Sequence, residues 1–342
     1  MNKSGKGKRI AVNIAGTLII PVVFLVVLEI ICLSGGKQMI SNLTSFNNFM
    51  IYTAIVMITT LALSVNLNSG RFDFSLGSMA LLSSTISAKI TYAILGGGNG
   101  SAIVMLILTI IIGALIGLFS GLAYVSLRIP PIITSLGMTL LFEGITYTIT
   151  AGKYIMSEVQ NASMAAFSST WIWTLLIIVI VLAVMIVLFD HTKFGYDYKA
   201  LQNGQKVSVN TGIKEVGNAV KCYMISGGLM GIVGFLNTIR NTNINGGQLN
   251  FASIGIMFTA FLPMFIGGYI GRYSNDKLGY LLAALCLSML NSTFAAFSNQ
   301  ISASTQSIIN AVLLVIFLIY LNNEGLLKKI FHPVRKAKGA DA

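Results

Sequence analysis

The chain has 342 residues, of which 55% are hydrophobic and only 9% are charged, and its formal net charge is +12. Soluble domains carry about 25% charged residues, so this composition excludes a water-soluble globular protein. Apolar runs such as Trp171–Phe189 reach the ~20 residues that a helix needs to cross a bilayer. Lipid offers the backbone no hydrogen-bond partners, and these runs lack the alternation of a barrel strand. The sequence therefore predicts an all-α polytopic membrane protein.

About ten membrane spans follow one another along the chain. The first is longer than the apolar region of a signal peptide, so we expect a membrane helix rather than a cleaved leader. The third is rich in Ser and Gly, and the eighth contains Pro263 and Gly267-Gly268, so either is a candidate for a broken or re-entrant element. The predicted spans lie near residues 11–33, 46–66, 73–88, 102–124, 130–150, 170–189, 219–239, 252–270, 277–297 and 304–321.

The distribution of Lys and Arg predicts that both termini lie inside. With this orientation, all but four of the 22 Lys and Arg residues fall on the inner side, where an excess is expected. The outer four are Lys37, Lys89, Lys153 and Arg240. This asymmetry accounts for the net charge without a nucleic-acid partner. We expect the basic cytoplasmic tail, 326–342, to lie against anionic lipid headgroups.

Motifs for catalysis, ATP binding or metal binding are missing from the sequence. The three cysteines, Cys32, Cys222 and Cys286, share no ligand-like spacing, so we interpret them as small buried apolar residues. His191 and His332 are isolated from them and from each other. The chain has no phosphate-binding loop, nucleophile elbow or HExxH motif. We therefore predict a non-enzyme that binds no metal or cofactor itself.

Three carboxylates fall within or beside membrane spans, where a charge is costly. Glu29 lies near the outer end of the first span and is interpreted as an interfacial group. Asp73 precedes a predicted helix, where a carboxylate caps free N–H groups. That capping role does not exclude a functional one. Glu143 is deeper, and structural hydrogen bonding and the lining of a pathway are equally compatible with it.

A polar, basic segment, "DYKALQNGQKVSVNTGIKEVGNAVK" (Asp197–Lys221), interrupts the apolar sequence on the predicted inner side. Asn203 or Gly204 is a plausible helix start, and Gly212 a plausible left-handed stop. A helix of some eight residues is unstable alone in water and needs a surface to pack on. Two interpretations remain: a solvated loop, or a docking element for a cytoplasmic partner.

This segment resembles the cytoplasmic coupling loop of bacterial ABC-importer permeases of the ribose, galactose and xylose type. The family pattern is approximately A-L-G-G-N-E-x-A-x-x-x-S-G-I, and the chain reads "ALQNGQKVSVNTGI" from Ala200 to Ile213. "SGRFDFSLGS" (Ser69–Ser78) resembles G-G-I-D-L-S-V-G-S, and "IPPIITSLGM" (Ile129–Met138) resembles I-P-x-F-I-x-T-L-G-M. The last third of the chain also follows the C-terminal pattern of the family. The resemblance therefore covers roughly residues 45–325.

The chain also departs from the family pattern. Gln202-Asn203 replaces a Gly pair, Phe72 replaces Ile before the aspartate, and "YIGRYSNDKLG" replaces a Gly-rich turn after Gly267-Gly268. These departures indicate an atypical subgroup.

The resemblance implies one transmembrane permease domain, 1–325, with a coupling loop at about 190–218. It implies a location in the bacterial cytoplasmic membrane and a pairing with a second permease chain, either the same or a homologous one. A solute-binding protein outside would deliver a sugar-like substrate, and cytosolic ABC ATPase subunits would use ATP and Mg²⁺. The implied ATPase contacts are Lys199, Ala200, Leu201, Asn203, Gly204, Gly212 and Ile213. The candidates for lining the translocation path are Asn66, Asn68, Asp73, Ser75, Thr134, Glu143 and Asn291.

Two alternatives stay open at this point. An ABC permease for another solute, such as a branched-chain amino acid or a nucleoside, would share the same architecture. A secondary transporter would instead use Asp73 or Glu143 as an ion site and would need no ATPase.

Overall fold

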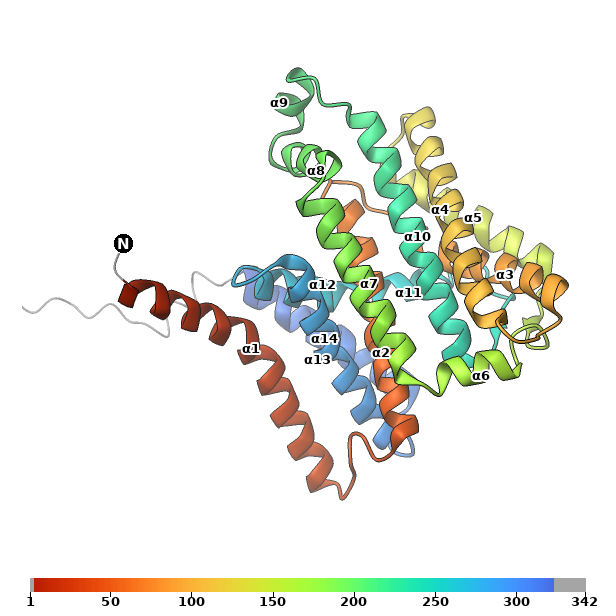
Figure 1. Cartoon of the computed structure of the whole chain (residues 1–342), viewed down its shortest axis with the longest axis horizontal. Helices are drawn as coiled ribbons and strands as arrows, with labels where there is room; N and C mark the ends of the chain where they lie inside the picture. Colours follow the sequence, from red (N-terminus) through yellow and green to blue (C-terminus); the bar gives the residue numbers. More distant parts are fainter. Residues whose placement is uncertain (1–2, 323–342) are drawn as a thin grey trace, which may run out of the picture. The chain divides into compact units, whose positions relative to one another are not determined.

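The computed structural model describes residues 3–322, which form helices and two short strands (Figure 1). The predicted basic tail, 326–342, and His332 lie outside the described residues. The elements are α1 (Lys3–Ser34), α2 (Leu43–Leu67), α3 (Leu76–Leu95), α4 (Ser101–Leu127), α5 (Pro131–Thr150), β1 (Tyr154–Ile155), α6 (Ala162–Ser168), α7 (Trp171–Asp190), α8 (Lys193–Asn203), α9 (Gln205–Asn210), α10 (Glu215–Asn241), β2 (Ile244–Asn245), α11 (Ile254–Phe258), α12 (Phe261–Gly271), α13 (Asp276–Ala296) and α14 (Ala303–Asn322).

The chain divides into two compact units, Met1–Ala296 and Phe297–Ala342. Within residues 3–322, nine helical segments are long and apolar enough to cross a membrane, and all nine lie in the first unit. Each coincides with one of the first nine predicted spans. In the second unit, the apolar stretch of α14 is shorter, Ser304–Ile319. The prediction of an all-α polytopic membrane protein is confirmed, while the prediction of a single domain stays a prediction.

The helix α2 forms the centre of the first unit and packs against α7, α10 and α13 (Figure 1). Its sequence is apolar nearly all round, which is typical of a helix surrounded by other helices. Accordingly, 83% of its apolar stretch is buried, against 11% for α1. Within the first unit, the helix α1 has α12 and α13 as neighbours, and most of its described apolar side chains are exposed.

The helices α4 and α10 pack closely along a line of glycines. Gly113 and Gly117 on α4 face Gly227 and Gly231 on α10. A Cβ added at Gly227 would lie 2.3 Å from the backbone oxygen of Gly113, closer than any real contact. Small residues four positions apart let membrane helices approach until their backbones touch. This pairing fixes α10 against the rest of the unit.

On the predicted outer side, β1 and β2 pair antiparallel, Tyr154 with Asn245 and Ile155 with Ile244. The pairing joins the segment after α5 to the segment after α10. It therefore links the outer ends of α5 and α10.

We predict that Gly227→Val destabilises the protein, since the added side chain collides with the α4 backbone. Overpacking of this kind costs about 1–3 kcal/mol, and the melting temperature of the detergent-purified chain measures it. Gly137→Val is the matched control, because an added Cβ at Gly137 meets nothing within 4 Å. Equal melting temperatures for the two variants would contradict the close packing of α4 on α10.

Candidate functional site

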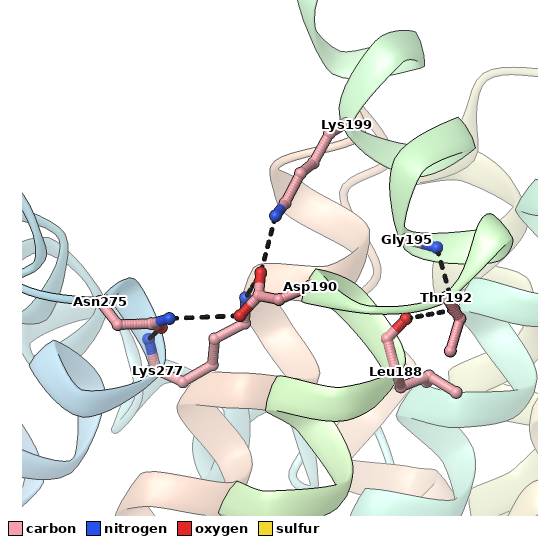
Figure 2. A network of polar contacts seen from close by, with 7 residues as sticks. All are labelled: Leu188, Asp190, Thr192, Gly195, Lys199, Asn275 and Lys277. Carbon is pink, nitrogen blue, oxygen red and sulfur yellow. Dashed lines mark hydrogen bonds and ion pairs between the residues drawn. The ribbon is translucent and has the colours of Figure 1, made fainter.

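The polar segment on the predicted inner side forms two short helices, α8 and α9. The helix α9 begins directly after Gly204 and is followed by Gly212 in the left-handed region, with φ +93°. The start and the end of α9 therefore match the positions predicted from the sequence. The helix α8 was not predicted. It begins at Lys193, and the hydroxyl of the preceding residue, Thr192, accepts a hydrogen bond from the Gly195 amide at 3.3 Å (Figure 2).

The helix α8 is held against the inner end of α2 by Tyr198. The buried Tyr198 hydroxyl donates to the carbonyl of Val65 at 2.9 Å, with the Ser64 carbonyl at 3.3 Å. Burial raises the pKa of Tyr198 above its ordinary value, which keeps the phenol a donor. Its ring also packs edge-on against Phe189 of α7, at 5.0 Å between centroids. The helix α9 is joined to α8 because the Ser208 hydroxyl donates to the Ala200 carbonyl at 2.8 Å.

Asp190, the last residue of α7, connects α8 to the start of α13 (Figure 2). Its Oδ1 atom accepts from Lys199 Nζ at 2.7 Å and from Lys277 Nζ at 2.8 Å. Its Oδ2 atom accepts from the Asn275 amide at 3.2 Å. One carboxylate thus links α7 and the neighbouring α8 to α13, which is distant in the sequence. We call α8 and α9, with this cluster and Tyr198, the inner platform.

An open cavity of about 620 Å³ lies between α8 of the inner platform and the start of α10. Lys193, Lys214 and Lys221 line it together with one carboxylate, Asp197, so its lining is basic. Of the predicted coupling residues, Gly212 and Ile213 line this cavity. Lys199 belongs to the Asp190 cluster, Leu201 is buried, and Ala200, Asn203 and Gly204 lie at the end of α8. The side chains of Val207 and Val209 on α9 are exposed.

The chain between α2 and α3 is not helical, and a buried carboxylate organises it. Asp73 Oδ1 accepts from the amide of Ser75 at 2.9 Å and from its hydroxyl at 2.6 Å. Asp73 Oδ2 accepts from the Asn66 side-chain amide at 3.2 Å. Asp73 therefore satisfies donors of Ser75, the residue just before α3, and its predicted capping of the helix itself stays a prediction. Asn66, Asp73 and Ser75 form one buried cluster.

The eighth span is broken into α11 and α12, and Glu143 of α5 holds the segment that leads into α11. Glu143 accepts from the amides of Phe251 at 3.0 Å and Ser253 at 2.9 Å, and from the Ser253 hydroxyl at 2.6 Å. Asn250 and Phe251 both have positive φ, 58° and 68°. Such a backbone is strained in residues with a Cβ, so it needs support from its surroundings. Glu143 thus makes the structural hydrogen bonds that the sequence left open, and its place in the path stays a prediction.

The remaining path candidates lie in separate places. Thr134 is buried on α5, and Asn68 lines a small cavity of about 60 Å³ beside Tyr198 and Lys199. Asn291 lines a different cavity at the predicted outer end. The structure thus brings together only Asn66, Asp73 and Ser75 of the seven, and the path assignment stays a prediction.

Sequence reasoning missed the residues that attach the inner platform, namely Asp190, Tyr198 and Lys277. The signal for Asp190 was available: it is a lone carboxylate at the inner end of an apolar span, next to many lysines. Its partner on α13 is 87 positions away in the sequence, and no local pattern indicates that pair.

Comparisons with known proteins agree on the kind of chain this is. A family model described as "Branched-chain amino acid transport system / permease component" matches residues 45–319. The inner membrane ABC transporter permease protein YjfF of Escherichia coli is 22% identical over 83% of this chain and 83% of its own length. The ribose import permease protein RbsC of E. coli is 23% identical over 81% and 85%. The galactose/methyl galactoside import permease protein MglC of Haemophilus influenzae is 26% identical over 58% and 64%. No solved structure matches.

We predict that Glu143→Gln destabilises the chain, because an amide cannot accept all three hydrogen bonds and brings its own donors toward them. Hydrogen bonds to charged groups contribute about 1.5–3 kcal/mol each. Thermal unfolding of the purified chain measures the loss, and limited proteolysis shows whether residues 246–260 become accessible.

The matched control is Glu158→Gln, which removes an ion pair with the exposed Lys89 at 2.9 Å. Such surface pairs contribute at most about 1 kcal/mol. If Glu143→Gln unfolds like the wild type and only transport is lost, the structural role of Glu143 is wrong.

Proposed function

Because the chain belongs to the permease-component family of branched-chain amino acid transport systems, we propose that it forms the translocation path of an ABC importer for a sugar-like solute. It is a multi-pass protein of the cytoplasmic membrane. In this proposal, a cytosolic ATPase docks on the inner platform, a second permease chain completes the path, and a solute-binding protein delivers the solute outside.

The sugar assignment is supported by the relatives rather than by the family description. The permeases RbsC and MglC are named for ribose and for galactose or methyl galactoside import. The galactofuranose transporter permease protein YtfT of E. coli is 23% identical over 68% of this chain. The second candidate is a branched-chain amino acid, which the family description favours. Uptake measured with labelled ribose and labelled leucine in competition distinguishes these two candidate solute classes.

The observation that carries the ATPase proposal is the attachment of the inner platform to the membrane helices. An exposed segment that served only as a linker would need no buried anchor. Here, Tyr198 is buried against α2, and Asp190 joins α8 to α13. A force applied to α8 by a docked partner would therefore reach both spans without passing through a flexible hinge.

The chemistry of ATP hydrolysis belongs to the partner in this proposal, and the permease supplies two conformations. A nucleotide can shift the populations of those two states only through a contact that differs between them. The Asp190 cluster is suited to that role, since its ion pairs cross from α8 to α13 and lie at the edge of the membrane. The Lys277–Asp190 pair is partly buried, so salt screens it less than the exposed Lys199–Asp190 pair.

We predict that a chain carrying Lys199→Glu and Gly212→Pro no longer retains the ATPase when it is extracted from native membranes. The first change places a negative charge beside Asp190, and the second requires a φ near −65° where the structure has +93°. Mass spectrometry of the co-purified proteins is the measurement.

Lys153→Glu on the predicted outer side is the matched control and should retain the ATPase. If wild-type chain retains no ATPase, even after crosslinking with a non-hydrolysable nucleotide, docking on the inner platform is refuted. Uptake that continues without ATP while a proton gradient persists would instead support a secondary transporter.

We further predict that Asp190→Asn retains the ATPase but lowers the number of solute molecules moved per ATP several-fold. The variant loses both ion pairs of Asp190, to Lys199 on α8 and to Lys277 on α13, while Tyr198 still holds α8 in place. Asp190→Glu keeps the charge and should recover most of the ratio. An unchanged ratio in Asp190→Asn would show that the cluster does not transmit the motion.

A further inference from the structure

A polar cavity lies at the predicted outer end of the first unit, between the α1–α2 connection and the outer ends of α10 and α13. Its volume is about 400 Å³. Gln38, Ser45, Asn48, Arg240, Asn241 and Asn291 supply its polar lining. We call this cavity the Arg240 pocket. Small-molecule sites in proteins have volumes of about 300–1,000 Å³, so it has room for a monosaccharide.

Arg240 is fixed in this pocket without a carboxylate partner. Its guanidinium carbon lies 4.7 Å from the centre of the Tyr52 ring, and Nη2 donates to Asn291 Oδ1 at 3.4 Å. Among the described residues, no carboxylate lines the pocket or forms an ion pair with Arg240. A guanidinium carries several N–H donors, so most of its hydrogen-bonding capacity is left for another acceptor.

Because Arg240 is half-buried, the N–H donors of its guanidinium that lack an acceptor point to a ligand site. A charged side chain beside a membrane span is costly, and such residues are expected to pair or to serve a functional site. Of the other outer cations, Lys37 and Lys153 are exposed, and Lys89 on α3 pairs with Glu158 at 2.9 Å. Arg240 instead faces a cavity lined by amides and hydroxyls, which suit the hydroxyls of a sugar.

We propose that the Arg240 pocket binds an anionic sugar, with the carboxylate of the ligand on Arg240 and its hydroxyls on the surrounding amides. A planar guanidinium matches a carboxylate through two parallel hydrogen bonds. The assignment rests on the proposed function in that it refines the solute class from a sugar to a sugar acid.

The test uses two sugars that differ at one carbon. Galacturonate carries a carboxylate where galactose carries a hydroxymethyl group, so the pair isolates the charge. Binding of each to the detergent-purified full chain is measured by isothermal titration calorimetry, with acetate as the anion without a sugar. Galacturonate should bind at least about tenfold more tightly than galactose, the factor expected of a charge-assisted hydrogen bond.

Variants assign the preference to Arg240. Arg240→Gln should remove the difference between the two sugars, and Arg240→Lys should keep part of it. Lys37→Gln is the matched control, since Lys37 is an outer cation next to the pocket but not in its lining. It should leave the preference unchanged. Size-exclusion chromatography confirms that each variant is folded.

Equal binding of both sugars, binding of neither, acetate binding as tightly as galacturonate, or a preference that survives Arg240→Gln would each overturn the proposal. These results are independent of the ATPase test. A chain that retains its ATPase but ignores galacturonate refutes only the sugar-acid site. A chain that binds galacturonate but retains no ATPase refutes only the importer.

Discussion

The structure depends on satisfying backbone donors at the places where the membrane helices are interrupted. Lipid cannot bond these groups, so irregular backbone at this depth requires partners from the protein. Asp73 supplies them between α2 and α3, and Glu143 supplies them before α11. Both carboxylates are fully buried, and every hydrogen bond recorded at their oxygens comes from an N–H or O–H donor. The interruptions are thus defined parts of the fold.

The inner platform is connected to one of these interruptions. Tyr198 contacts the carbonyls of Ser64 and Val65, and the next residue, Asn66, donates to Asp73. A displacement of α8 therefore acts on the end of α2 and on the start of α3. The Asp190 cluster provides a second connection, to α13, whose outer end carries Asn291 in the Arg240 pocket. The proposed docking site and the proposed substrate site are thus at opposite ends of continuous helices.

Most of the fold follows from sequence patterns, because span length and apolarity are local properties. The eighth span is broken, as anticipated, but the break lies at Thr259-Ala260, and Pro263 and Gly267-Gly268 fall inside α12. The third span, the other candidate for a break, is the continuous helix α3. The limits of α9 follow from Gly204 and Gly212. The contacts that join distant segments could not be predicted in this way. The hydrogen bond between Glu143 and Ser253 joins residues 110 positions apart in the sequence, and the one between Tyr198 and Val65 joins residues 133 positions apart. The glycines of α4 and α10 carried a usable signal, a four-residue spacing in both helices, which our sequence interpretation did not use.

The most direct test of the account places a photo-crosslinking amino acid at Val207, an exposed residue of α9. Inside-out membrane vesicles are illuminated with the cytosolic fraction present, with and without ATP, and the adducts are identified by mass spectrometry. The account predicts one principal adduct with a soluble ABC ATPase, whose yield changes with nucleotide. Adducts only with lipid, or labelling of position 207 from the outer side of the membrane, would contradict it.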